Sequence, residues 1–270
     1  MKRKITILTI AFLSSVLMYA NAFAAATGRC GNSITWTLDD SGNLTLSGSG
    51  EMWNNGYGDS PFKDYEIRKA TVKYGITSIG ESAFLGCRGM TELILPNSVT
   101  SIGGNAFEGC SGLTELTLPN SVTSIGDSAF YVCRGLEKIT VESGNSCYDS
   151  RDNCNSIIDK KTNTLIVGCK NSIIPNSVTS IGSGAFAYCS GLTELTLPNS
   201  VTSIGDGAFG DCSGLSKITS LAEIPPVCGY GVFDGVNKTN CELIVPKGSV
   251  AAYKQAYGWN GFSNIRGFSE

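Results

Sequence analysis

One eight-residue sequence recurs verbatim along this chain and constrains the fold more than any other feature. Pro-Asn-Ser-Val-Thr-Ser-Ile-Gly begins at Pro96, Pro119, Pro175 and Pro198, and columns of Phe, Cys and Leu follow it at a spacing of 23 residues. The spacing fails once, between positions 125 and 181, where one period carries 33 extra residues. Self-similarity at a fixed period of this length indicates a solenoid, in which each turn packs against its neighbours.

The residues of one period predict the structure of one turn. Apolar and polar residues alternate over 115–118, which is the pattern of a strand with one buried face. Pro119 ends this strand, Asn-Ser turns the chain, and 122–125 is a second short extended segment. Gly126 permits a corner, after which 127–130 is expected to begin a single helical turn with Asp127 as its cap.

No single turn buries its own large apolar side chains. We therefore expect each interior column to stack on copies of itself along the chain, at the strand spacing of about 4.8 Å. The predicted fold is a β-rich (α+β) solenoid of 23-residue turns over residues 76–219. Its central column is formed by Phe84, Phe107, Phe130, Phe186 and Phe209.

The flanking segments have the patterns of caps. Residues 34–38 and 44–46 alternate around a polar turn, which predicts a β-hairpin in an N-terminal cap over 25–75. This hairpin would cover the open strand edge of the first turn. In a C-terminal cap over 220–270, residues 241–246 predict a last strand and 250–257 a short helix, with Trp259, Phe262 and Ile265 closing the hydrophobic end.

The extra residues form an inserted segment over 142–174. Two apolar strands, 157–158 and 165–167, flank a six-residue polar loop, which predicts a hairpin projecting from the solenoid. Insertions in one repeat often lie on the working face of a solenoid, and a tolerated surface loop is the alternative.

The repeat also resembles a known family. Leu-x-x-Leu-x-Leu-Pro followed by Val-x-x-Ile-Gly-x-x-Ala-Phe-x-x-Cys is similar to the repeat of the BspA-like (TpLRR-type) bacterial leucine-rich repeat proteins, in register from 76 to about 219. The resemblance implies a curved leucine-rich repeat stack with its sheet on the concave face. It also implies export, a surface location and binding to host or microbial macromolecules.

The start of the chain predicts export. Residues 1–24 combine three basic residues, a 14-residue apolar run and Ala-x-Ala sites, which is the pattern of a secretory signal peptide. The run is shorter than the roughly 20 residues that span a bilayer, so we expect no transmembrane segment. The predicted location is extracellular or at the cell surface, with the periplasm as the alternative.

Composition excludes several function classes. The chain has no histidine, so catalysis and metal binding that need an imidazole are impossible within it. Proteins that bind nucleic acids usually carry a stripe of basic residues, and this sequence has none, so we expect no nucleic-acid partner. The acidic residues Asp39, Asp40, Asp149, Asp152 and Asp159 fall in predicted turns or loops, where Asp is ordinary turn chemistry. We expect no enzyme, no cofactor and no metal.

The 11 cysteines divide into two groups. Five share one interior column and are expected to pack as buried thiols, with bridges between neighbouring turns as the alternative. Of the others, Cys147 with Cys154 and Cys228 with Cys241 are possible disulfides across loops. The column comprises Cys87, Cys110, Cys133, Cys189 and Cys212.

The residues at outward-facing strand positions are the candidate ligand-binding residues. A ligand on this face would be held by many polar contacts. Adhesion to a protein or glycan macromolecule by a monomer is the predicted function. A glycan-capture module of a polysaccharide-uptake system, which would use the exposed aromatics Trp53 and Tyr57, and a purely structural surface module are the alternatives; Tyr65 is a third aromatic expected to be exposed. The two candidate rows are Glu92, Glu115, Lys138, Glu194 and Lys217, and Ile94, Thr117, Thr140, Thr196 and Thr219.

Overall fold

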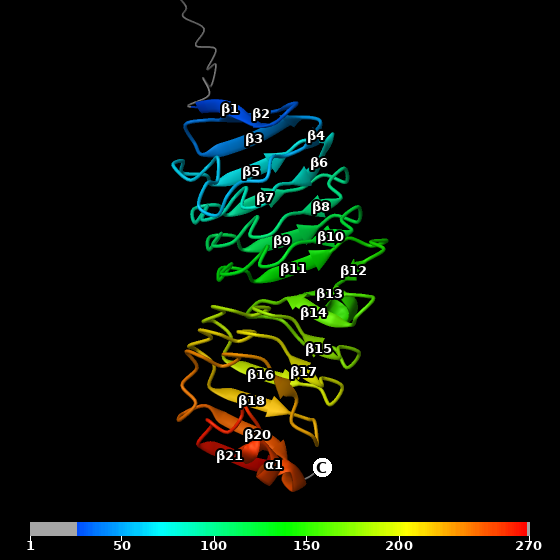
Figure 1. Cartoon of the computed structure of the whole chain (residues 1–270), viewed down its shortest axis with the longest axis vertical. Helices are drawn as coiled ribbons and strands as arrows, with labels where there is room; N and C mark the ends of the chain where they lie inside the picture. The colour runs from blue at the N-terminus through cyan, green and yellow to red at the C-terminus, as the bar shows by residue number, and fades with distance from the viewer. Residues whose placement is uncertain (1–25, 269–270) are drawn as a thin grey trace, which may run out of the picture.

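Parallel strands stacked turn upon turn dominate the protein, which is known from a computed structural model that describes residues 26–268. Figure 1 shows the stack running from the N-terminal end at the top to the C-terminal end at the bottom. The first sheet of each turn uses β5 (Lys69–Val72), β7 (Glu92–Ile94), β9 (Glu115–Leu118), β11 (Lys138–Val141), β16 (Glu194–Leu197), β18 (Lys217–Ser220), β20 (Glu242–Pro246) and β21 (Asn264–Phe268).

A second set of shorter strands lines another side of the same turns. It comprises β4 (Gly50–Glu51), β6 (Ile76–Ile79), β8 (Ser101–Ile102), β10 (Ser124–Ile125), β15 (Ser180–Ile181), β17 (Ser203–Ile204) and β19 (Val227–Cys228). Neighbouring turns pair in parallel and in the register of the repeat, so that Lys138 lies opposite Glu115 and Ile125 opposite Ile102. The predicted β-rich solenoid is therefore confirmed.

The repeated octapeptide makes contacts between turns. Its Ser hydroxyl donates to a carbonyl of the preceding turn, as Ser121 does to Val99 at 2.6 Å. Its Thr hydroxyl donates to the carbonyl of its own copy one turn earlier, as Thr123 does to Thr100 at 3.3 Å. The same bonds recur in other copies. Because each polar residue contacts the adjacent turn, the verbatim repeat has a structural explanation.

The segment between the second-sheet strand and the Cys column differs from the prediction. In 126–133 the backbone is left-handed at Ser128 (φ 56°) and Val132 (φ 60°), and the equivalent residues of other turns are left-handed too. Alternate N–H groups bond to the next turn, as Phe107 does to Ala129 at 2.8 Å. We call this set of bonds the turn ladder. The predicted helical turn is wrong, because left-handed residues cannot continue an α-helix.

The N-terminal cap is an antiparallel meander. β1 (Ala26–Gly31), β2 (Ile34–Leu38) and β3 (Asn43–Gly48) pair in order, and β3 continues into the first sheet by pairing in parallel with β5. The Asp39 carboxylate closes the β2–β3 turn by accepting the N–H groups of Ser41 and Asn43, both at 2.9 Å. The predicted hairpin is confirmed, and β1 is an additional strand.

The C-terminal end is closed by aromatic side chains. Trp259 and Phe262 are buried and lie 5.0 and 5.2 Å, between ring centroids, from Phe233. The short helices η2 (Lys247–Ser249) and α1 (Val250–Gln255) follow β20, so the predicted helix is present but ends two residues early. Ile265 lies in β21, an additional strand that pairs in parallel with β20.

The inserted segment joins the stack. It forms β12 (Tyr148–Asp149), η1 (Arg151–Asn153), β13 (Ile157–Asp159) and β14 (Thr164–Val167), and the predicted hairpin is the β13–β14 pair. The expected projection from the solenoid is wrong, because β14 pairs in parallel with β15 of the next turn. Ile157, Ile158 and Leu165 are fully buried there. Burying each of these side chains is worth roughly 1.5–3 kcal/mol, which favours incorporation over projection.

The phenylalanine column is divided into two stacks. Phe130 stacks on Phe107 with ring centroids 5.3 Å apart, and Phe186 stacks on Phe209 at 5.1 Å. Phe130 and Phe186 do not stack, and they belong to separate core clusters. The expectation that the column stacks on copies of itself throughout is therefore wrong at the insertion. The first stack is Phe62, Phe84, Phe107 and Phe130, and the second is Phe186, Phe209 and Phe233.

Side chains of the insertion terminate the first half of the solenoid. Within residues 26–268, β11 pairs with no strand other than β9, and Asn155 occupies its open edge. Its Oδ1 accepts the N–H of Ile139 at 2.6 Å, and its Nδ2 donates to the carbonyl of Glu137 at 2.8 Å. Ser150 Oγ accepts the N–H of Val141 at 2.9 Å. The amide of Asn155 thus replaces a peptide group of the missing strand.

Candidate functional site

The charged row of the first sheet consists of ion pairs between neighbouring turns. The five predicted residues Glu92, Glu115, Lys138, Glu194 and Lys217 all take part, and Arg266 pairs with Glu242 in the same way. Each exposed ion pair of this kind stabilises the fold by about 0–1 kcal/mol. The two charges of a pair neutralise each other, so neither needs a ligand. The pairs are Lys69–Glu92 at 2.7 Å, Lys138–Glu115 at 3.3 Å and Lys217–Glu194 at 3.1 Å.

The neighbouring row does not form one continuous face. Thr117 lies opposite Thr140, and Thr196 opposite Thr219, but Ile94 lies on β7, which is not paired with β9. The two threonine pairs also belong to different sheets, because β11 and β16 are separated by the insertion. The role of both rows in binding stays a prediction.

Two acidic residues of the insertion, Asp149 and Asp159, have structural partners. Asp149 pairs with Arg151 at 2.8 Å, and Arg151 also donates to Asn163 Oδ1 at 3.0 Å. Asp159 accepts the N–H groups of Lys161 and Thr162 in the β13–β14 loop. These carboxylates stabilise turns.

All 11 cysteines are thiols in the structure, and the column of five is buried as predicted. Burial raises the pKa of Cys87, Cys133 and Cys212 from 9.0 to about 12. Cys147 packs against the first core cluster and Cys154 lies in the second, while Cys228 and Cys241 are separate thiols of the second. The two pairings stay a prediction.

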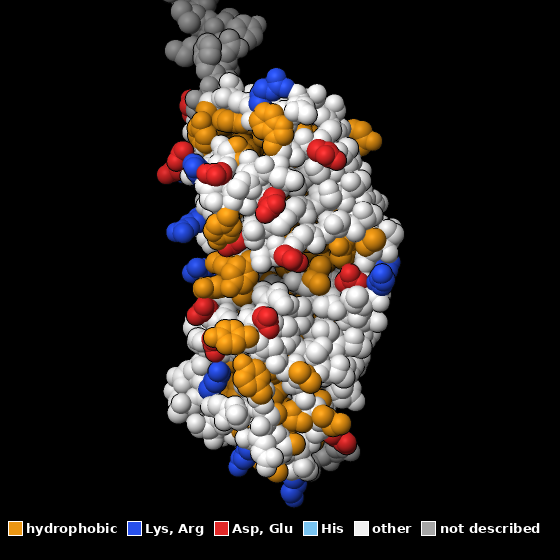
Figure 2. Space-filling model, in the orientation of Figure 1, with side chains coloured by type: hydrophobic (Ala, Val, Ile, Leu, Met, Phe, Trp, Pro, Cys, Tyr) orange, Lys and Arg blue, Asp and Glu red, His pale blue; other side chains and the backbone are white. Residues whose placement is uncertain are grey.

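Tyrosine and arginine side chains gather where the turn segments meet solvent. Part of this group lines a hollow of about 480 Å³. In Figure 2, hydrophobic and basic side chains lie together along the left edge of the stack, whereas much of the remaining face is neither charged nor hydrophobic. We call the group the tyrosine surface, and it comprises Tyr57, Arg88, Glu108, Tyr131, Arg134 and Tyr188.

Specific contacts connect the members of the tyrosine surface. The Tyr57 hydroxyl donates to Glu108 Oε1 at 2.9 Å, and this bond raises the pKa of Tyr57. The rings of Tyr131 and Tyr188 meet edge to face, with centroids 5.8 Å apart. The Arg134 guanidinium carbon lies 5.5 Å from the centroid of Tyr188, within the range of a cation–π contact.

The arginines of this surface differ from the charges of the strand row. Within residues 26–268, neither Arg88 nor Arg134 forms an ion pair with a carboxylate. Tyr57 is 71% exposed. Tyrosine and arginine are enriched among the residues that dominate binding energy at protein interfaces. The arrangement is therefore suited to holding a partner by ring and guanidinium contacts.

Sequence analysis identified only Tyr57 of this surface. Tyr131 follows Phe130 by one residue, whereas Tyr188 follows Phe186 by two, so the two tyrosines occupy different columns of the repeat. For Tyr188 the available signal was its departure from Gly86 and Gly109, which occupy the same column in earlier turns, whereas the Tyr131 column varies from turn to turn. Of the other predicted aromatics, Trp53 is 44% exposed, and Tyr65 packs edge to face on Trp36.

Residues 26–268 contain no helix long and apolar enough to cross a membrane. The same residues hold no group of three or more Cys, Asp or Glu side chains placed to bind a metal ion.

Comparison with known proteins agrees with the fold. Residues 57–164 and 156–240 match the family model described as the BspA type leucine rich repeat region, in six copies. The chain matches none of the curated proteins with which it was compared.

Several solved structures are similar to this chain. A leucine rich cell surface protein from Faecalibacterium prausnitzii is 17% identical, with a TM-score of 0.51 and coverage of 92% of this chain and 96% of that one. A leucine-rich repeat protein from Eubacterium ventriosum is 23% identical, with a TM-score of 0.43 and coverage of 90% of this chain and 85% of that one. The T. pallidum leucine rich repeat protein is 22% identical, with a TM-score of 0.40 and coverage of 77% of this chain and 89% of that one. These likenesses concern the fold alone.

Proposed function

Because this chain belongs to the BspA-type leucine-rich repeat family, we propose that it is an exported, non-enzymatic protein that binds a macromolecule at or outside the bacterial cell surface. Adhesion to a protein partner is the form of this function that we put forward. The export signal falls in residues 1–24, which lie outside the described residues. The sequence pattern of that segment supports export.

One observation supports binding at the tyrosine surface in preference to the strand rows. The strand charges are neutralised by their neighbours, whereas Arg88 and Arg134 are unpaired within residues 26–268 and line the same hollow as the exposed Tyr57. Repeats that are otherwise nearly identical differ here in side chains that are not needed for stacking. A partner would gain contacts at this surface without breaking an existing ion pair.

Binding to immobilised extracellular-matrix proteins, measured by surface plasmon resonance, tests this proposal. We expect the double variant Arg88→Ala, Arg134→Ala to bind at least about tenfold more weakly, since loss of a central arginine commonly costs more than 1 kcal/mol. The matched control removes the same charge from the exposed Lys161 and Lys247 and should bind normally.

A third variant distinguishes the tyrosine surface from the predicted strand face. Replacing Thr117, Thr140 and Thr196 by Lys alters the outward rows without touching the tyrosine surface. Retained binding by the triple Lys variant supports the proposal. If the triple Lys variant loses binding while the double Arg→Ala variant binds normally, the site lies on the strand face.

Glycan capture is the second candidate. It is favoured by Tyr57, whose exposed ring is held in place by the bond of its hydroxyl to Glu108. A glycan array would show binding that Tyr57→Ala abolishes and the Lys161, Lys247 control retains. Equal glycan binding by Tyr57→Ala and by the unmodified protein would contradict a sugar site at this ring.

A further inference from the structure

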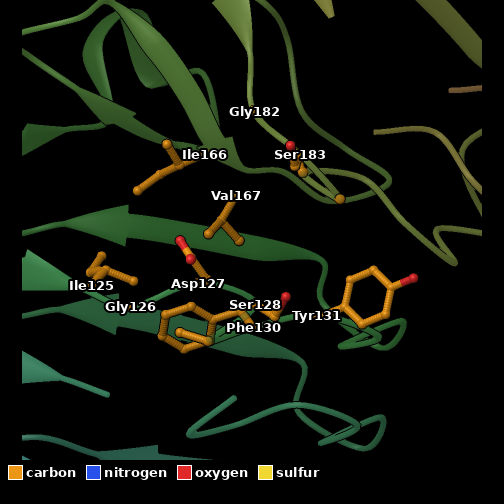
Figure 3. A pocket seen from close by; sticks show the side chains of 13 residues that line it. Ile125, Gly126, Asp127, Ser128, Phe130, Tyr131, Ile166, Val167, Gly182 and Ser183 are labelled. Carbon is orange, nitrogen blue, oxygen red and sulfur yellow. The ribbon is translucent and has the colours of Figure 1, made fainter. Parts of the chain in front are cut away.

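A cleft separates the two phenylalanine stacks. Its volume is about 460 Å³, within the range of roughly 300–1,000 Å³ that ligand pockets occupy. Figure 3 shows Ile125 and Phe130 along one wall, with Ile166 and Val167 facing them across the cleft. Asp127 lies between the walls in the same view. Phe130 and Val167 belong to the first core cluster and Ile125 and Ile166 pack against it, whereas Ala185, which also lines the cleft, belongs to the second.

The turn ladder is closed in the turn before the cleft. There, three alternate N–H groups each donate to a carbonyl of the following turn. The bonds are Asn105 to Asp127 at 3.0 Å, Phe107 to Ala129 at 2.8 Å and Gly109 to Tyr131 at 2.8 Å.

The ladder is open at the cleft. The equivalent N–H groups belong to Ser128, Phe130 and Val132, and none of the three has a hydrogen-bond acceptor within residues 26–268. Ser128 and Phe130 line the cleft. Unpaired backbone donors are rare in folded proteins away from water, so these groups indicate an incomplete ladder.

The facing wall presents the matching acceptors. By the register of the repeat, the carbonyls of Ser183, Ala185 and Ala187 would accept these bonds. The Ala185 carbonyl instead accepts the N–H of Gly168 at 2.8 Å, and the carbonyls of Ser183 and Ala187 accept no hydrogen bond from any part of the described chain. One wall of the cleft therefore offers donors and the other acceptors.

We propose that this cleft binds an extended peptide segment of another polypeptide, whose main chain completes the turn ladder. The peptide accepts hydrogen bonds from the N–H groups of Ser128 and Phe130 and donates one to the carbonyl of Ser183. An apolar side chain of the peptide rests on Ile125 and Val167. Donors two residues apart match carbonyls two residues apart on another main chain, as they do in the closed turn, and main-chain pairing at an open edge is a recurring mode of peptide recognition.

Amide hydrogen exchange on the unmodified protein tests the proposal. In the free protein, the amides of Ser128, Phe130 and Val132 should exchange faster than the equivalent amides one turn earlier, at 105, 107 and 109. A pooled library of acetylated, amidated hexapeptides with randomised side chains should slow exchange at Ser128 and Phe130. Equal protection of the two turns in the free protein, or no change with the library, would overturn the proposal.

A blocking variant and a modified peptide supply the second test. Ser183→Tyr places a ring at the mouth of the cleft, and the fold accommodates this residue because Tyr230 occupies the same column in a later turn. The hexapeptide selected above should bind at least about tenfold more weakly to this variant, and so should its N-methylated form to the unmodified protein, since each loses main-chain hydrogen bonds.

The matched control is Glu81→Tyr, which adds the same ring to the same column where the ladder is closed. It should bind the hexapeptide as the unmodified protein does, and equal melting temperatures of the two Tyr variants show that both fold. Undiminished binding by Ser183→Tyr, or by the N-methylated peptide, would refute main-chain recognition in the cleft.

Discussion

Backbone conformation at single residues shapes every turn of this solenoid. The position two residues after the column Phe is left-handed in each turn, and it is Gly86, Gly109 and Gly235 in three of them. At Val132 the same conformation is held by a β-branched residue, for which it is strongly disfavoured. The preceding turn holds the segment beside Val132 through the bond from the Gly109 N–H to the Tyr131 carbonyl at 2.8 Å.

Val132→Gly should therefore stabilise the protein by about 1 kcal/mol, because glycine adopts the left-handed region freely. The free energy of unfolding in urea measures the effect. The reciprocal change Gly109→Val, at the same position one turn earlier, should destabilise by a similar amount. Changes of the same sign in the two variants would contradict the conformational explanation.

The buried thiols make stability depend on alkaline pH. Burial raises the pKa of Cys133 from 9.0, its value in the unfolded chain, to about 12. The stabilising contribution is fully present below pH 9 and is lost as pH rises toward 12, because the unfolded chain releases the proton first. The slope approaches about 1.4 kcal/mol per pH unit for each such thiol.

We accordingly expect the free energy of unfolding to fall between pH 9 and pH 10.5 in urea titrations. Tyr and Lys residues titrate in the same range, so the informative comparison is with Cys133→Ala, whose stability should fall less steeply with pH. Parallel slopes for the two proteins would rule out the Cys133 thiol as a source of the dependence.

At the scale of elements, the insertion ends one sheet and extends the other. Its strand β14 continues the second set of strands, while the amide of Asn155 bonds to the edge of β11. A single side chain satisfies a donor and an acceptor that a further strand would otherwise pair. The first half of the solenoid therefore depends on Asn155 for its last turn.

Replacing Asn155 by Ala should destabilise the protein by about 1–3 kcal/mol, the cost of leaving the part-buried Ile139 N–H unpaired, while the Glu137 carbonyl still accepts a bond from Asn171 Nδ2 at 3.1 Å. Asn155→Asp keeps the acceptor for Ile139 and loses the donor to Glu137, so its effect should be intermediate. Exchange of the Ile139 amide, followed by NMR, reports the bond directly. An unchanged exchange rate in Asn155→Ala would show that the edge is held by other contacts.

At the scale of the whole molecule, the protein contains two hydrophobic cores in one stack. Phe130 is the last phenylalanine of the first core and Phe186 the first of the second. The insertion lies between them in the chain and contributes to both cores: Ile157 and Val167 belong to the first, and Ile158 and Leu165 to the second. In a solenoid, stability is approximately a sum of the turns and of the interfaces between neighbours. A weak interface at the cleft should let the halves lose structure separately.

Truncation of one phenylalanine in each stack tests this division. Phe107→Ala should cost about 3–5 kcal/mol and increase hydrogen exchange mainly before residue 140, while Phe209→Ala should act mainly after residue 175. Exchange measured peptide by peptide separates the two responses. An increase spread equally over both halves in either variant would mean that the cores unfold as one unit.

Much of the tyrosine surface and of the cleft lay beyond sequence reasoning. Tyr131 and Tyr188 come together because an inserted segment changes which turns are neighbours, and this follows only from how that segment packs. The charges of Glu115 and Lys138 were visible as an outward row, but their mutual pairing depends on the parallel register. An outward position alone does not show that a side chain is free to contact a ligand, because Glu115 and Lys138 bind each other.

The sequence by itself determined the solenoid, its period, the interior columns and the hairpin of the N-terminal cap. The solenoid features depend on contacts between equivalent residues of adjacent turns, which a repeat displays directly, and the hairpin depends on local alternation around a polar turn. Only the tertiary structure decided the left-handed turn segments, the incorporation of β14 and the interruption between Phe130 and Phe186. Each of these depends on hydrogen bonds and packing at one place in the stack, where the residues that meet are no longer copies of one another.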